Sequence, residues 1–148
     1  MAFRRLLCAA VAVNSLDESL PRYTEGLGLK LHRIHQGERG YGIRVAELGD
    51  GETPMLELIE SPGDGPVRRF LEKHGEGLYQ IRLETDGLYD TIKELEGRGV
   101  RTVMPQPKGG GERIAQPEED ITLAFVHPSS TSGVLIEMYP PEESGQWF

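Results

Sequence analysis

The chain has 148 residues, a length that suits one domain or two fused half-domains that share a core. Its 16 Lys and Arg stand against 24 Asp and Glu, a net charge of −8, and no basic stripe is interleaved with aromatic residues, so nucleic acid is excluded as an expected partner. The 19 glycines and 10 prolines favour many short elements joined by turns, as in a sheet-containing protein.

The cysteine content and the N-terminal segment indicate the cellular compartment in which the protein is expected. The single cysteine, Cys8, cannot form an internal disulfide, which indicates a reducing compartment. Arg4 and Arg5 precede the apolar run Leu6 to Val13, and this run contains an Ala-x-Ala sequence like a signal-peptidase site. The run is far shorter than the ~20 residues of a membrane-spanning helix, and a first β-strand explains it equally well. We expect a cytoplasmic protein with no membrane partner.

A strand followed by a helix occurs twice in the chain. A shift of 72 residues, the offset from Ala9 to Ile81, places Ala9, Val11, Leu16, Leu20 and Tyr23 on Ile81, Leu83, Leu88, Ile92 and Leu95. Each copy begins with a predicted strand, 8–13 or 80–85, and continues into a helix whose apolar residues recur at spacings of four and three. The second helix is expected at 88–96. This repeat indicates two copies of one supersecondary unit.

Three strand-like segments follow the helix in each half. We expect them at 30–35, 43–48 and 55–59 in the first half, and at 101–104, 122–126 and 134–138 in the second. Clusters of Gly, Pro, Ser and Asp separate them as turns. Residues 66–74 have apolar residues at helical spacing behind a first-turn proline, which predicts a linking helix. Residues 105–120, with three consecutive glycines, predict a long mobile loop.

These elements predict an α+β fold made of two βαβββ modules, residues 1–62 and 78–148, joined by a linker with a short helix at 63–77. Each module would present a curved antiparallel sheet with an apolar face that it cannot bury alone. We therefore expect paired curved sheets around a shared cleft for one small molecule.

Two segments carry a resemblance to a known family. Residues 125–137, which read FVHPSSTSGVLIE, resemble the C-terminal motif of methylmalonyl-CoA epimerases, and GEGLYQI at 75–81 is similar to the start of a strand in the same family. With the repeat and FLEK at 70–73, the resemblance covers nearly the whole chain. It implies the vicinal oxygen chelate superfamily, which also holds glyoxalase I, extradiol dioxygenases and antibiotic-resistance proteins, and it implies a homodimer that binds a small molecule.

The family places four metal ligands on its inner strands, and by that pattern the positions here are Cys8, Glu57, Gln80 and Glu137. The repeat supports this pairing, because Cys8 and Gln80 are related by the same offset and the two glutamates share apolar neighbours. Either glutamate is a lone charge in an apolar strand. For Glu57 in particular, the alternative is a side chain on the solvent face of the sheet.

This chain departs from the family at two of the four ligands, where the epimerases have histidines. Cys8 must ionise to bind a metal well, and the neutral amide of Gln80 is a weak oxygen donor. A divalent metal (Mg, Mn, Co, Ni or Zn) is therefore expected to bind only weakly. The four histidines do not restore the set: His32 and His35 face opposite sides of a strand, and all four are interpreted as surface or satisfied polar residues.

The resemblance implies an isomerase or epimerase that removes the α-proton of an acyl-CoA or similar small carbonyl compound and returns a proton to the other face. Glu137 matches one of the glutamates that transfer the proton in the family, and Glu38 is the candidate for the second. Without a metal, the enolate would be stabilised by backbone amides or by arginines such as Arg44 and Arg82.

Two further residues of the C-terminal motif, Ser130 and Thr131, are candidate substrate contacts. A function of another class also stays open: a metal-free protein that keeps the cleft and binds a small molecule for sequestration or resistance.

Overall fold

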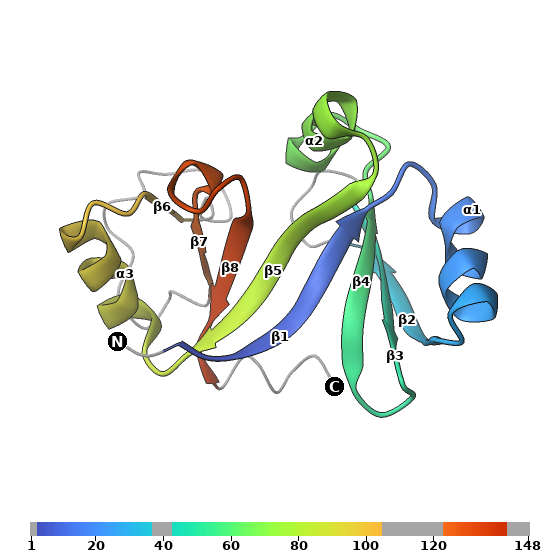
Figure 1. Cartoon of the computed structure of the whole chain (residues 1–148), viewed down its shortest axis with the longest axis horizontal. Coiled ribbons are helices and arrows are strands. Elements are labelled where there is room, and N and C mark those ends of the chain that lie inside the picture. Colours follow the sequence, from blue (N-terminus) through green and yellow to red (C-terminus); the bar gives the residue numbers. More distant parts are fainter. Residues whose placement is uncertain (1–2, 37–42, 105–122, 142–148) are drawn as a thin grey trace. The chain divides into compact units, whose positions relative to one another are not determined.

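The computed structural model describes residues 3–36, 43–104 and 123–141. Two compact units make up the chain, a first unit of residues 8–79 and a second unit of residues 1–7 with 80–147. Strands β1 (Phe3–Ala12) and β5 (Gly77–Thr85) each contribute to both units (Figure 1). The loop predicted at 105–120 and the candidate Glu38 lie outside the described residues.

The first unit has the predicted βαβββ order. After β1 come α1 (Leu16–Pro21), a π-helical turn (Arg22–Gly26), β2 (Lys30–Gln36), β3 (Arg44–Gly49), β4 (Pro54–Glu60) and the linking helix α2 (Pro66–His74). The strands lie in the order β2-β3-β4-β1. The β4–β1 pair is parallel, with Ala10 opposite Glu57, and the other two pairs are antiparallel. A helical crossover between β1 and the rest of the sheet permits this parallel pair.

Side chains on the two faces of this sheet pack against different helices. On the face that α1 covers, here the α1 face, Ala46, Leu48 and Leu58 form a core with Leu16 and Val13. On the other, here the Ala10 face, the core consists of Ala10, Ala12, Val45 and Ile59 with Val67 and Leu71 of α2. Alternation along each strand sends neighbouring residues to opposite faces, so both faces of the strands are apolar over part of their length.

The second unit repeats the arrangement. Strand β5 is followed by α3 (Leu88–Gly97), β6 (Thr102–Val103), β7 (Ala124–Val126), a 3-10 turn (Pro128–Ser130) and β8 (Leu135–Tyr139). The order is β5-β8-β7-β6, with β5 and β8 parallel and the other pairs antiparallel. Leu88, Ile92 and Leu95 of α3 pack on Ala124, Val126 and Met138. We call the covered side the α3 face and the opposite side the Gln80 face.

The predicted α+β class and the internal repeat are confirmed. The linking helix has the predicted bounds, whereas β1 begins at Phe3 rather than Cys8, and β6 is shorter than the expected 101–104. The module boundaries at 62 and 78 stay a prediction. Among the helices that the structure describes, none combines the length and apolar character needed to span a bilayer.

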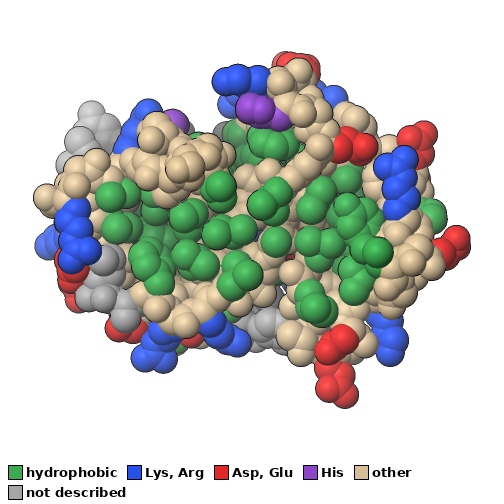
Figure 2. Space-filling view, viewed as in Figure 1, with side chains coloured by type: hydrophobic (Ala, Val, Ile, Leu, Met, Phe, Trp, Pro, Cys, Tyr) green, Lys and Arg blue, Asp and Glu red, His purple; other side chains and the backbone are tan. Residues whose placement is uncertain are grey.

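Several large apolar side chains are exposed, among them Leu6, Met55 and Leu78. Figure 2 shows hydrophobic side chains gathered on the face in view in each unit. Exposed apolar side chains that gather on one face are a feature of association surfaces. The homodimer expected from the resemblance stays a prediction.

Candidate functional site

Glu137 lies on the Gln80 face of the second unit. On β8 its neighbours Ile136 and Met138 turn to the α3 core, so the alternation of the strand turns Glu137 to the other side. Arg82 on β5 is its partner in the parallel register. The pattern of one charge between apolar residues thus places a carboxylate beside a guanidinium on a single face of the sheet.

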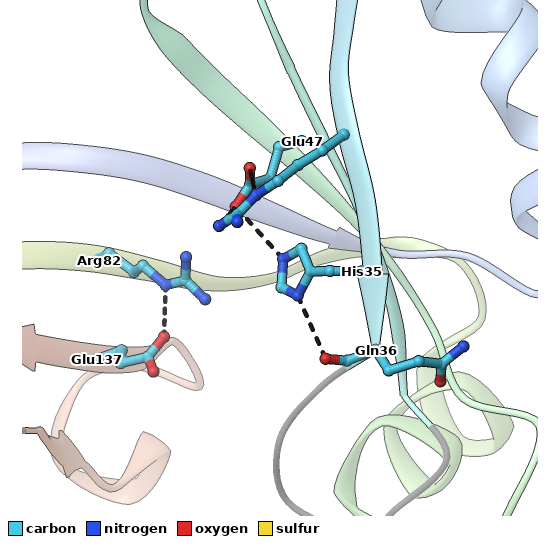
Figure 3. Close-up of polar contacts among 6 residues, drawn as sticks. His35, Gln36, Glu47, Arg82 and Glu137 are labelled. Atoms are coloured by element: carbon cyan, nitrogen blue, oxygen red, sulfur yellow. Dashed lines mark hydrogen bonds and ion pairs between the residues drawn. The ribbon is translucent and has the colours of Figure 1, made fainter. Parts of the chain in front are cut away.

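Three donors hold the Glu137 carboxylate. Arg82 Nε donates to Oε2 at 2.7 Å and Gln80 Nε2 donates to the same oxygen at 2.9 Å, while the Tyr139 hydroxyl donates to Oε1 at 2.8 Å. All four residues are buried, and the Arg82 guanidinium carbon lies 5.6 Å from the centroid of the Tyr139 ring. Figure 3 shows the Arg82–Glu137 contact. Charge-assisted hydrogen bonds of this kind fix a carboxylate firmly, and both of its oxygens are engaged.

A second charged cluster, with two buried glutamates and a half-exposed arginine, lies on the Ala10 face of the first unit. The cross-strand register places Arg33 opposite Glu47 and Glu47 opposite Glu57, and each of the two glutamates is only 2% exposed. Arg33 binds Glu47 in a bidentate manner, through Nε at 2.5 Å and Nη2 at 3.1 Å. His35 Nε2 lies 3.3 Å from Glu47 Oε1 (Figure 3).

The charges in this cluster act on Arg33. Its hydrogen bond with Glu47 raises the pKa of the guanidinium above its ordinary value, burial opposes this increase, and the negative charges of Glu47 and Glu57 add smaller increases. Burying two carboxylates on neighbouring strands requires such compensation, because like charges directly opposite each other destabilise a sheet.

Glu57 is therefore buried, which excludes the alternative of a side chain on the solvent face of the sheet. Sequence reasoning missed Glu47, although Ala46 and Leu48 flank it in the same pattern of a lone charge between apolar residues. It also missed Arg33 and Tyr139, for which no comparable local signal exists.

Of the other candidates, Cys8 is buried on β1, where alternation with Ala10 and Ala12 turns it to the Ala10 face, the face that also carries Glu57. Arg44 pairs with Glu60 at 3.1 Å, and Glu60 also accepts the Leu16 N–H at 3.3 Å, so the Arg44 side chain belongs to the surroundings of α1. A substrate contact by Arg44 stays a prediction.

Ser130 and Thr131 shape the turn that precedes β8. Ser130 Oγ accepts the Arg101 N–H at 3.0 Å, and Thr131 Oγ1 donates to the Val134 carbonyl. His127 caps the 3-10 turn, since its Nδ1 accepts the Ser129 N–H at 3.0 Å. Backbone groups thus bind the side chains of this turn, and the predicted substrate contacts of Ser130 and Thr131 remain predictions.

The donor set around Glu137 does not fit the divalent metal that the resemblance implies. Gln80 presents its amide N–H to the carboxylate, and Arg82 binds the same oxygen. A cation on that oxygen would have to displace both donors and would lie close to a guanidinium, which repels it. In the described ranges, no group of three or more His, Cys, Asp or Glu could hold a metal ion.

Comparison with known proteins agrees with this fold. The family model of the Glyoxalase/Bleomycin resistance protein/Dioxygenase superfamily matches residues 9–116. A mitochondrial methylmalonyl-CoA epimerase of Dictyostelium discoideum is 32% identical over 132 residues, which cover 87% of this chain and 74% of the relative.

Solved structures with a similar fold point to the same family. A hypothetical protein of Bacillus halodurans C-125 is 32% identical with a TM-score of 0.72, over 92% of this chain and 93% of the other. Methylmalonyl-CoA epimerase from Mycobacterium tuberculosis is 27% identical with a TM-score of 0.71, over 92% and 87% of the two chains. The resemblance drawn from the sequence is confirmed: the chain belongs to the Glyoxalase/Bleomycin resistance protein/Dioxygenase superfamily.

Proposed function

We propose that this protein is an epimerase-like isomerase that transfers a proton at the α-carbon of an acyl-CoA thioester or a similar small carbonyl compound. The observation that carries the proposal is the buried Glu137 carboxylate, held in one orientation by Gln80, Arg82 and Tyr139. The similarity to proteins named methylmalonyl-CoA epimerase supports a branched acyl-CoA as the substrate class.

In this reaction a base removes the α-proton, and the electrons of the broken C–H bond move toward the carbonyl carbon, so that negative charge develops on the carbonyl oxygen. A proton returned to the opposite face of the α-carbon completes the inversion. Glu137 is the proposed base, because a positioned carboxylate accepts a proton efficiently. Glu38 stays the predicted second acid-base residue.

A second candidate function follows from the same cluster. Because both oxygens of Glu137 already accept hydrogen bonds from buried donors, the cluster also suits a protein that binds a small molecule without transforming it. In that case the Gln80 face of the second unit binds the ligand, and the ligand loses no proton.

Deuterium incorporation separates the two functions. We expect the wild type, incubated in D2O with methylmalonyl-CoA, to incorporate solvent deuterium at the α-carbon, as measured by mass spectrometry. Glu137→Gln keeps the shape and removes the charge, so exchange should fall by about 100-fold or more while binding, measured by calorimetry, changes little.

The matched control is Glu60→Gln, which alters an arginine-paired glutamate near α1 and should leave the exchange rate within about twofold of the wild-type rate. Binding without any exchange above background would support the binding protein instead. Equal exchange rates in wild type and Glu137→Gln would show that Glu137 is not the base.

A further inference from the structure

We infer that Arg82 is the resident cation of the second unit's polar cluster and that the protein handles its carbonyl ligand without a divalent metal. The inference rests on the proposed function for the identity of the reaction. It concerns the source of positive charge at the site, which the resemblance assigns to a metal bound by Cys8, Glu57, Gln80 and Glu137.

The first argument is the position of Arg82. It is 8% exposed, its Nε lies 2.7 Å from Glu137 Oε2, and the ring of Tyr139 lies beneath its guanidinium. The parallel register of β5 and β8 holds Arg82 and Glu137 side by side. A guanidinium keeps its charge throughout the physiological pH range and loses little freedom when it binds, because its planar group is rigid. It is therefore a permanent, oriented positive charge.

The second argument is competition for Glu137. Gln80 and Arg82 share one carboxylate oxygen and Tyr139 takes the other. Gln80 acts here as a donor, although a metal ligand must offer a lone pair. Gln80, at one implied ligand position, and the neighbouring Arg82 thus both bind the Glu137 carboxylate that a metal would need.

The third argument comes from the first unit and is independent of the second. Glu57, another implied metal ligand, lies opposite Glu47, and Arg33 binds Glu47 through two N–H groups. The charge of Glu57 also acts on Arg33. In each unit, therefore, an arginine pairs with a buried glutamate of the neighbouring strand, Arg33 with Glu47 on the Ala10 face and Arg82 with Glu137 on the Gln80 face.

Arg82 would act on the charge that develops during proton transfer. As the base takes the α-proton, negative charge accumulates on the carbonyl oxygen, and a fixed guanidinium nearby lowers the energy of that enolate. Return of a proton to the α-carbon restores the neutral carbonyl. The step needs no redox partner and no co-reactant.

Metal titration of the wild type is the direct test. We expect no stoichiometric binding of Co²⁺ or Mn²⁺ at micromolar concentrations, as followed by calorimetry and by the visible spectrum of Co²⁺. The exchange rate should be the same in EDTA and with added Mn²⁺. One tightly bound equivalent per chain, or exchange that EDTA abolishes and Mn²⁺ restores, would overturn the inference.

Arg82 variants supply a second test. Arg82→Ala should reduce exchange by about 100-fold or more, and free guanidinium should restore part of the rate while Mn²⁺ restores none. The control Arg5→Ala removes another arginine of the same unit, one that pairs with Glu84 and is 58% exposed, and should change the rate by less than about twofold. Full activity of Arg82→Ala, or its rescue by Mn²⁺, would contradict the inference. Should this variant not fold, the metal titration of the wild type decides alone.

Failure of the proposed function gives a different result from failure of this inference. A wild type that exchanges no deuterium refutes the isomerase. Binding of a non-reactive acyl-CoA analogue then reports on the cation: we expect equal affinity with and without EDTA, and a loss of affinity in Arg82→Gln that Arg82→Lys partly restores. Affinity that depends on added Mn²⁺ would overturn the inference in this case too.

Discussion

The buried pair of Arg82 and Glu137 should be strongly coupled in stability. Their side chains are only 10% and 7% exposed, so solvent screens the interaction little. Removing one partner of a buried ion pair leaves an uncompensated charge and costs about 3–5 kcal/mol. Glu137→Leu also removes the carboxylate that accepts the hydrogen bonds of the Gln80 amide and the Tyr139 hydroxyl, and each lost hydrogen bond contributes about 0.5–1.5 kcal/mol more. We therefore expect Glu137→Leu to be more destabilising than Arg82→Met.

The double variant Arg82→Met/Glu137→Leu distinguishes coupling from independent effects. If the two substitutions acted independently, their losses of unfolding free energy would add. Because the double variant removes both charges together, its loss should be smaller than that sum by at least about 2 kcal/mol. The assay is urea unfolding followed by circular dichroism at one pH and salt concentration.

The control for this cycle is an exposed pair on α3. Arg98 Nη2 lies 3.5 Å from Glu94 Oε2, and the two side chains are 64% and 43% exposed. The coupling free energy of this pair should be no more than about 0.5 kcal/mol. Additivity within about 0.5 kcal/mol for Arg82 and Glu137 would refute the view that Glu137 is held chiefly by its arginine.

Two further predictions concern the turn between β3 and β4. A Cβ at Gly49 would lie only 2.8 Å from the Thr53 carbonyl carbon, so Gly49→Ala should lower the free energy of unfolding by about 1–3 kcal/mol. The control Gly77→Ala adds a Cβ that meets no atom within 4 Å, and its free energy of unfolding should stay within about 0.5 kcal/mol of the wild-type value. Equal effects of the two substitutions would contradict the packing argument. The N–H groups of Thr53 and Glu52 donate to Asp50 and hold the pKa of that carboxyl below its ordinary value of 3.8. This contribution to stability is present above that value and is lost as the pH falls below it. Wild type should therefore lose more stability than Asp50→Asn between about pH 5 and about pH 3 in urea unfolding, and parallel losses would show that Asp50 does not contribute.

Local patterns in the sequence determined the elements and their repetition. Apolar residues at spacings of three and four, a first-turn proline and clusters of turn residues are short-range signals, and they placed α2 at Pro66–His74 and α3 from Leu88 onward. The repeat of strand, helix and three strands predicted the α+β class, because each half needs a partner surface for its apolar face. Family membership was visible from the C-terminal motif at 125–137.

Tertiary structure alone decided the partners of the charged residues. A lone glutamate in an apolar strand is compatible with either face of a sheet, and the choice depends on which face a helix covers and on the cross-strand register. Register brought Arg82 beside Glu137 and placed Glu47 between Arg33 and Glu57. These residues are far apart in the chain, so no local periodicity connects them. The sequence therefore identified Glu137 and Glu57 as unusual, while the pairing of strands placed Arg82 beside Glu137 and Glu47 beside Glu57.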